Sequence, residues 1–276
     1  MDLLNNKKNY DIRSNLSFNE IQKLNIIHNT YKTQREKINY NFNNYLLNKY
    51  CKFSNQDNFW NLFNKLDGIV DLSDPDTSMP NSLHALQTAE AMRRDNRPDW
   101  MCLTGLIHDM GKILYIKGCD EDGTSINTQW AIVGDTFITG CKIPNNIVLS
   151  EYNNFNEDHK NNLNIYSNNC GLDNCSVSFG HDEYMYRLLR ANCNTLPLEA
   201  EYMVRYHSLY TWHSTNSYDY LENDLDREIK SWVQEFNKYD LYTKDDNNII
   251  SWTDELREYY ENLVKKYISY DLEIIY

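Results

Sequence analysis

The feature that most restricts how this chain can fold is a His-Asp pair inside an apolar run. His108 and Asp109 lie side by side in LTGLIHDMGKIL, residues 103–114, where the pattern of apolar residues predicts a helix. Burying an imidazole and a carboxylate costs free energy unless other groups pair with them. Adjacent helical residues point about 100° apart, so both side chains reach one centre only at the edge of the helix. The fold must therefore bring further polar groups or cations to that edge.

The rest of the chain is organised mainly as helices. Glycine and proline number only 9 and 5 among 276 residues, which disfavours a β-sandwich with many turns. Apolar residues first recur at the helical period at Ile21, Leu24, Ile27 and Tyr31. Further helices are predicted over 58–70, 83–94, 98–114, 180–192, 197–207 and 226–244.

The boundaries of these elements also follow from the sequence. Asn81 or Ser82 is suited to cap the helix over 83–94, and Pro98 suits the first turn of the helix that follows. No internal repeat or linker divides the chain. We therefore expect a loosely ordered segment over residues 1–18 and a single, mainly α-helical domain over 19–276.

Charge and composition exclude several classes of partner. The net charge is −13 and the pI is near 4.9, so the chain should repel a nucleic-acid backbone. No stretch is apolar enough for a membrane span, and the N-terminus lacks a signal-peptide core. Seven cysteines without disulfide-scaffold density indicate a reduced, cytoplasmic protein. Cys170 and Cys175 alone are weak grounds for a zinc site.

Histidines and aspartates at several predicted helices form the pattern that indicates chemistry. A second His-Asp pair, His181-Asp182, resembles the first. The candidate ligands for two metal ions are His84, His108, Asp109, His181, His207 and Asp240. Helical bundles build buried two-metal sites from such convergent ligands, and a set without thiolate suits Fe, Mn or Zn. Asp109 could place one carboxylate oxygen on each of two ions.

Each of these residues also has a purely structural interpretation. His84 could make a hydrogen bond in the core, and His207 could interact with the C-terminal end of a helix. Lys112 and Lys244 taken singly would be ordinary solvated lysines. However, Lys112 follows Asp109 by three positions and Lys244 follows Asp240 by four, so each lysine shares a helix face with a candidate ligand.

Longer sequence strings separate the possible enzyme classes. The chain resembles the myo-inositol oxygenase family of the HD-domain superfamily from about residue 20 to the C-terminus. The strings that carry this resemblance are VDLSDPD, HALQTAEAMR, GLIHDMGK, QWAIVGDTF, CGLDN, GHDEYMY, RYHSLY and FNKYDLYTK. The resemblance implies an HD-domain-like helical bundle that uses O₂ to cleave the ring of myo-inositol to D-glucuronate. It also implies two iron ions per chain, as a mixed-valent Fe(II)/Fe(III) non-haem centre, and a monomer.

The resemblance also assigns individual residues. It places iron on the six candidate ligands and implies catalytic roles for Lys112 and Asp109. The implied substrate-binding residues are Arg13, Asp71, Leu72, Ser73, Lys112, Gly134, Asp135, His207, Ser208 and Lys244. This chain departs from the family pattern at Leu72, where an acidic residue is usual, at a longer loop over 117–128, and at Phe179, where tryptophan is usual.

Two enzymatic alternatives and one non-enzymatic alternative remain at this stage. The same ligands could activate water in an HD-type two-metal phosphohydrolase, although Asp71 and Asp135 would repel a phosphate. The altered Leu72 and the longer loop also allow an oxygenase for another inositol isomer or polyol. A binding module that has kept the fold without activity is the third possibility, although such modules usually lose metal ligands.

Overall fold

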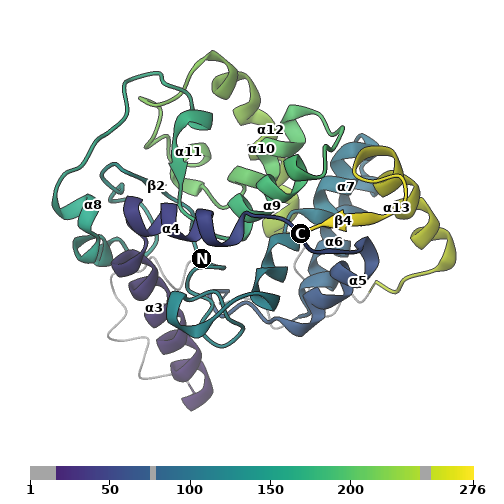
Figure 1. Cartoon of the computed structure of the whole chain (residues 1–276), viewed down its shortest axis with the longest axis horizontal. Helices are drawn as coiled ribbons and strands as arrows, with labels where there is room; N and C mark the ends of the chain where they lie inside the picture. Colours follow the sequence, from purple (N-terminus) through teal and green to yellow (C-terminus); the bar gives the residue numbers. More distant parts are fainter. Residues whose placement is uncertain (1–16, 75–78, 243–249) are drawn as a thin grey trace.

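The computed structural model describes residues 17–74, 79–242 and 250–276. Figure 1 shows that helices make up most of this part of the chain and that strands are few and short. The prediction of one mainly α-helical domain is therefore confirmed. None of the described helices has the length and the apolar character needed to cross a bilayer.

The α-helices are α3 (Phe18–Lys37), α4 (Tyr40–Tyr50), α5 (Phe59–Asn64), α6 (Asn81–Arg94), α7 (Asp99–Ile107), α8 (Glu157–Lys160), α9 (His181–Ala191), α10 (Leu198–Tyr206), α11 (Tyr210–His213), α12 (Asp224–Tyr242) and α13 (Asp254–Tyr267). Short 3₁₀ helices are η2 (Lys65–Gly68), η3 (Met110–Ile116), η4 (Asp120–Asp122), η5 (Ser150–Phe155) and η6 (Leu172–Asn174). The strands are β1 (Gln56–Asn58), β2 (Ile138–Thr139), β3 (Ser176–Val177) and β4 (Glu273–Ile275).

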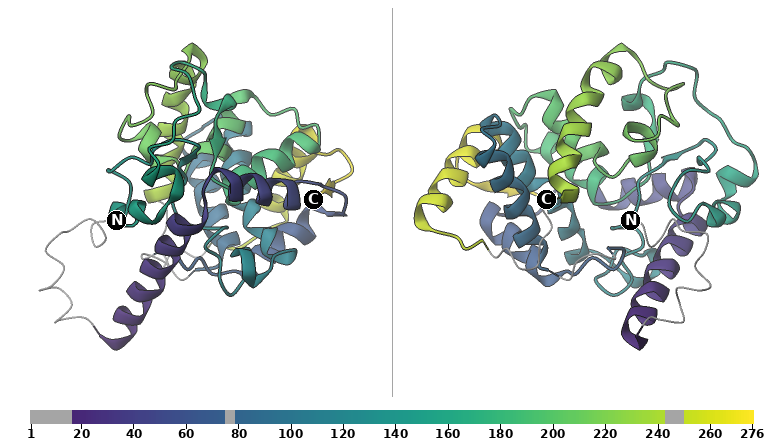
Figure 2. Two further views of the ribbon diagram at one scale, coloured as in Figure 1. Left: turned by 60° about the vertical axis from the view of Figure 1, so that its left-hand side comes forward. Right: turned by 180° about the vertical axis from the view of Figure 1, so that it is seen from behind.

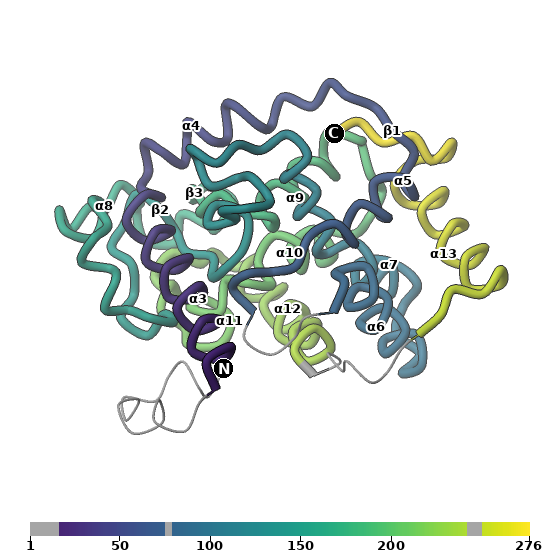
Figure 3. The backbone as a smooth tube through the Cα atoms, turned by 90° about the horizontal axis from the view of Figure 1, so that it is seen from below, coloured from purple at the N-terminus to yellow at the C-terminus, as the bar shows by residue number. Residues whose placement is uncertain are grey.

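Two antiparallel strand pairs join segments that are distant in sequence. Strand β1 pairs with β4, with Gln56 opposite Ile275, and β2 pairs with β3, with Ile138 opposite Val177. The pairing of β1 with β4 holds the C-terminal end of the chain beside α5, as the tube drawing in Figure 3 shows. Sequence periodicity missed both pairs because segments of two or three residues are too short to show an alternating pattern.

The helical core is centred on α7. Every residue of α7 from 101 to 107 is buried, as expected for a helix that is apolar on all sides. Helix α6 packs along it, and α10 and α13 cover further faces. Helix α3 lies at the other side of the molecule, and its N-terminal end extends away from the body in Figure 2.

Two of the differences between observed and predicted helix boundaries affect residues of the candidate site. Helix α6 begins at Asn81, with Pro80 as N-cap and no side-chain cap, so the predicted caps Asn81 and Ser82 are wrong. The Asn81 amide instead donates to the Ile69 carbonyl. The predicted helix over 98–114 ends as an α-helix at Ile107, and η3 follows it.

Close packing between η3 and α9 generates a prediction about Gly111. A Cβ added at Gly111 would overlap the backbone carbonyl of His181, and backbone atoms cannot turn away as a side chain can. We expect Gly111→Ala to destabilise the fold by roughly 1–3 kcal/mol, a usual cost of overpacking. Thermal unfolding measures this loss.

Gly68→Ala is the matched control because its added Cβ would meet only the end of the Tyr115 side chain. Equal unfolding temperatures for the two variants would contradict the proposed clash between η3 and α9.

Candidate metal centre

The six candidate ligands all lie at the ends of helices. His84 is in the first turn of α6, His108 and Asp109 directly follow α7, His181 begins α9, His207 follows α10, and Asp240 is in the last turn of α12. All six side chains are buried. The fold therefore brings together residues separated by up to 156 positions, as the hypothesis of a shared metal site requires.

The first group of donor atoms contains His84, His108 and Asp240. His84 Nε2 lies 2.9 Å from Asp240 Oδ1, and His108 Nε2 lies 3.4 Å from the same oxygen. Asp109 Oδ2 is 3.6 Å from His108 Nε2 and 3.9 Å from His84 Nε2. Two sets among these neighbours are close enough to hold a metal ion: His84 with His108 and Asp109, and His108 with Asp240 and His207.

The second group contains His181 and His207, and Asp109 joins it to the first. The two Nε2 atoms are 3.3 Å apart, and Asp109 Oδ1 lies 3.2 Å from His181 Nε2 and 3.9 Å from His207 Nε2. Asp109 thus directs one oxygen towards each group. This is the arrangement that a carboxylate needs to bridge two ions.

Backbone carbonyls orient three of the imidazoles. His108 Nδ1 lies 2.8 Å from Gly105 O, His181 Nδ1 lies 2.7 Å from Ile132 O, and His207 Nδ1 lies 3.0 Å from Val204 O. Metal-binding histidines commonly donate the other ring N–H in this way. The buried His108 Nε2 makes no hydrogen bond within the described chain. Its orientation and the N/O donor set both fit divalent transition-metal ions.

The cluster is strongly anionic. Burial lowers the pKa of His181, but the carboxylates of Asp182 and Asp109 outweigh burial and raise this pKa to about 10. Burial raises the pKa of Asp109, but Lys112 and His108 hold it well below its usual value. The carboxylates therefore favour a positive charge on His181 and also raise the pKa of His108, whereas burial lowers the pKa of His207. Metal ions bound to the same nitrogens would replace protons as the balancing charge.

Asp182 is a residue of this centre that sequence reasoning left outside the ligand set. Its Oδ1 lies 2.6 Å from His181 Nε2 and 3.3 Å from His207 Nε2, and its Oδ2 accepts a hydrogen bond of 2.8 Å from Thr136. The repeated His-Asp dipeptide was the available signal. Whether Asp182 points towards the centre depends on which face of α9 packs inward, and the tertiary structure decides this.

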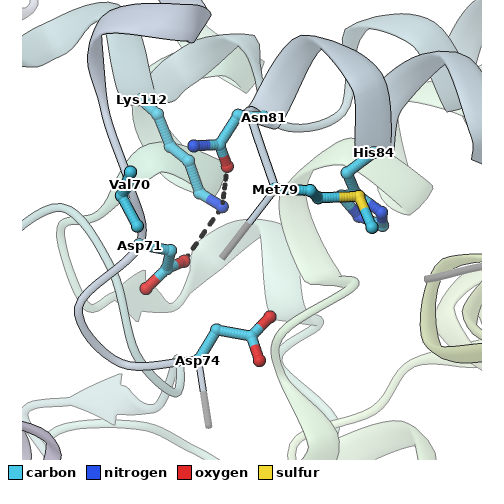
Figure 4. Close-up of a pocket in the computed structure, with 7 residues that line it drawn as sticks. All are labelled: Val70, Asp71, Asp74, Met79, Asn81, His84 and Lys112. Carbon is cyan, nitrogen blue, oxygen red and sulfur yellow. Dashed lines mark hydrogen bonds and ion pairs between the residues drawn. The ribbon is translucent and has the colours of Figure 1, made fainter. Parts of the chain in front are cut away.

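A small pocket opens beside the first group of ligands. Figure 4 shows the residues that line it: Val70, Asp71, Asp74, Met79, Asn81, His84 and Lys112. Lys112 Nζ donates to Asp109 Oδ2 at 2.9 Å and to Asn81 Oδ1 at 3.0 Å, and lies 3.0 Å from Asp71 Oδ2. Lys112 therefore connects the pocket to the carboxylate shared by both groups, although it does so from a 3₁₀ helix and not from the predicted α-helix.

The loop over 71–73 presents the Asp71 carboxylate to Lys112. The Ser73 hydroxyl and backbone N–H donate to Asp71 Oδ1 at 2.6 and 2.8 Å. Burial raises the pKa of Asp71, but Lys112 and Ser73 together lower it, so this carboxyl is an ionised acceptor at neutral pH. Leu72 donates its backbone N–H to Gln129, and its side chain is not among those lining the pocket.

The remaining predicted substrate residues lie near the second group or outside the described chain. Ser208 is buried, with its hydroxyl 3.5 Å from Asp182 Oδ1. Gly134 has φ +93°, a conformation that favours glycine, and leads to the buried Asp135. Neither Gly134 nor Asp135 lines the pocket of Figure 4. Arg13 and Lys244 lie outside the described residues.

The cysteine pair takes no part in the centre. Cys170 and Cys175 have sulfurs 3.7 Å apart. Within the described ranges, the groups suited to hold a metal are drawn from the six histidine and aspartate ligands and contain no cysteine.

The bridging position of Asp109 predicts a distinctive pattern of metal loss. If each group holds one ion, Asp109→Ala should weaken binding at both groups because each loses an oxygen donor. His84→Gln should weaken chiefly one, because the second group keeps all its donors. Metal content per chain after anaerobic loading with Fe(II) distinguishes the two outcomes. Retention of one tightly bound ion by Asp109→Ala would argue against a bridge.

The burial of Asp135 predicts how its contribution to stability depends on pH. Burial raises the pKa of Asp135 to about 6, against the lowering effect of Arg35. The folded state then holds the proton more tightly than the unfolded state, so this contribution to stability is lost as pH rises from about 4 to 6. As pH rises across that range, the free energy of unfolding of the wild type should fall by roughly 3 kcal/mol relative to that of Asp135→Asn. Urea unfolding of metal-free protein at several pH values measures the difference, and a constant difference would contradict the raised pKa.

Comparison with known proteins identifies the family. Residues 24–274 match the family model described as myo-inositol oxygenase. Inositol oxygenase from Danio rerio is 45% identical over 209 residues, which cover 73% of this chain and 72% of the relative. Inositol oxygenase from Dictyostelium discoideum is 42% identical over 221 residues, covering 77% and 73%. The human protein of the same name is 43% identical over 210 residues, covering 73% and 70%. A chain with this degree of likeness along most of its length, and with a buried cluster of histidines and aspartates, belongs to the myo-inositol oxygenase family.

Proposed function

We propose that this protein uses O₂ to cleave the ring of myo-inositol, giving D-glucuronate, at two iron ions held by the six ligands. The observation that carries the proposal is the chain of contacts from Asp71 through Lys112 to Asp109. It joins a pocket lined with hydrogen-bonding groups to the centre of the metal cluster. Membership of the inositol oxygenase family supports the same reaction.

The donors are compatible with iron, and the resemblance to the inositol oxygenase family favours iron over manganese and zinc. Four imidazoles and two carboxylates form a hard-to-borderline set that accommodates iron in more than one oxidation state. The iron pair, when bound, would supply the redox chemistry with O₂. The protein supplies position and electrostatic field: the six side chains would hold the ions, and Asp109 lies between the two groups of donors.

Lys112 is the main proton-handling group in this proposal. Its ammonium group is buried and has acceptors on both sides, Asp71 and Asp109. A hydroxyl of the substrate that comes within reach of Nζ would be stabilised in its deprotonated form by the positive charge. Asp71, which is already ionised, would accept a hydrogen bond from a neighbouring hydroxyl. A polyol suits such a site because each hydroxyl can both donate and accept.

The phosphohydrolase alternative fits the pocket poorly. Asp71 and Asp74 line it, and the described lining contains no arginine to bind a phosphate. A neutral polyol meets no such repulsion. The choice among inositol isomers and related polyols is a finer question, and the departure at Leu72 bears on it. Since Leu72 contacts Gln129 through its backbone, the loop could keep its position with a different side chain there.

Replacing Lys112 tests its role directly. Lys112→Ala should lower kcat by about 100-fold or more, the usual range for removing one electrostatic group from a reacting oxygen, while iron content stays at the wild-type level. Lys117→Ala is the control because that lysine contacts the Tyr276 ring instead. Loss of iron from Lys112→Ala would show that the lysine is structural.

Substrate identity is tested by O₂ consumption. Iron-loaded protein would be supplied with myo-, scyllo- and chiro-inositol and with nucleotides, and the uronic acid and released phosphate would be measured. We expect O₂ uptake matched by uronic acid with myo-inositol. Phosphate release from nucleotides without O₂ uptake would instead establish the phosphohydrolase.

A further inference from the structure

Arg35 is a buried cation that none of the roles above explains. It lies on α3, outside all the helices that carry metal ligands, and its side chain is fully buried. Its Nη1 donates to Gln34 Oε1 at 2.8 Å and its Nη2 to Val148 O at 3.4 Å. Its Nε makes no hydrogen bond within the described chain. A guanidinium keeps its charge even when buried, so this position requires a compensating negative charge.

Asp135 is the group that provides this charge. It is the one carboxylate among the described groups that act electrostatically on Arg35. No direct ion pair joins the two residues within the described chain, and Val148 lies between them. The Val148 carbonyl accepts from Arg35, while the Val148 backbone N–H binds the Asp135 carboxyl. Tyr31 provides a second link, with its hydroxyl 3.5 Å from Asp135 Oδ1 and its ring 5.9 Å from the Arg35 guanidinium.

Helix α3 also holds the backbone that leads to Asp135. Tyr31 and Arg35 are four residues apart, so they share a helix face, and Gln34 lies beside them. Gln34 Nε2 donates to the Val133 carbonyl at 3.0 Å. A Cβ at Gly134 would lie 3.2 Å from the Gln34 amide. One turn of α3 thus positions both the loop before Asp135 and the Arg35 guanidinium close to the Asp135 carboxylate.

We propose that Arg35 is a positioning residue for substrate, which acts by orienting the Asp135 carboxylate as a hydrogen-bond acceptor for the polyol. The inference rests on the proposed function in so far as Asp135 contacts substrate. The pairing of Arg35 with Asp135 is independent of any substrate. In this view α3 sets substrate affinity although it contributes no metal ligand.

The experiment is a double-mutant cycle with Arg35→Met, Asp135→Asn and the double variant. Thermal unfolding without substrate tests the pairing. Asp135→Asn leaves a buried cation without its counter-charge, so adding Arg35→Met to it should cost nothing or raise the melting temperature. The same Arg35→Met change should lower the melting temperature of wild type. If Arg35→Met alone does not fold, recovery of folding in the double variant supports the pairing, and failure of both contradicts it.

Steady-state kinetics with myo-inositol tests the positioning role. Arg35→Met should raise KM about tenfold or more, the range expected for losing a charge-assisted interaction, with kcat and iron content little changed. It should have no further effect on KM when Asp135 is already asparagine. Arg35→Lys should restore part of the affinity. Arg257→Met, which removes an arginine stacked on Trp60, is the control and should leave KM unchanged.

Additive effects of the two changes on both melting temperature and KM would overturn the proposal and make Arg35 a packing residue. The two changes could also be coupled in melting temperature while neither the wild type nor any variant oxidises myo-inositol. That result would support the pairing of Arg35 with Asp135 and contradict the proposed function.

Discussion

The carboxylate of Asp109 is the interaction on which the rest of the centre depends. One oxygen faces His84 and His108, and the other faces His181 and His207. A buried carboxylate is stable as an ion only if cations lie close to it, and Lys112 provides one at 2.9 Å. The first turns of α6 and α9 and the last turns of α7 and α10 therefore meet around this one side chain.

On two sides of the site, an acidic side chain is balanced by a buried cation. Asp71 is opposed by Lys112, and Asp135 is opposed by Arg35. Each acid is thus available as an acceptor, and each cation is itself buried. A neutral ligand that both donates and accepts hydrogen bonds can enter such a site without disturbing the balance, whereas an added phosphate would. The electrostatic design and the family relationship therefore favour the same class of substrate.

Much of the candidate site could be predicted from the sequence because its residues occur in unusual local settings. A His-Asp pair in an apolar run has few explanations, and Asp240 among core aromatics has the same property. Asp182 occurs in a second His-Asp pair, yet the sequence does not place it at the centre because nothing local reports which way its side chain points. Asn81 was expected to cap a helix, and its amide instead accepts from Lys112, 31 positions away.

The sequence by itself determined the helical class and the single domain, because these depend on the periodicity of apolar residues. It also identified the six residues that gather at the centre and the lysine beside them, through residue type and through the strings that resemble the family. Tertiary structure alone decided that α7 gives way to a 3₁₀ helix at the ligands, that β4 pairs with β1, and that α3 covers Asp135 with Arg35. The physical reason is that these features arise from contacts between residues about 100 or more positions apart, or from the packing constraints those contacts impose. Local propensity carries no information about which distant surface will lie opposite a given side chain, and the free energy of burying a charge depends on that surface.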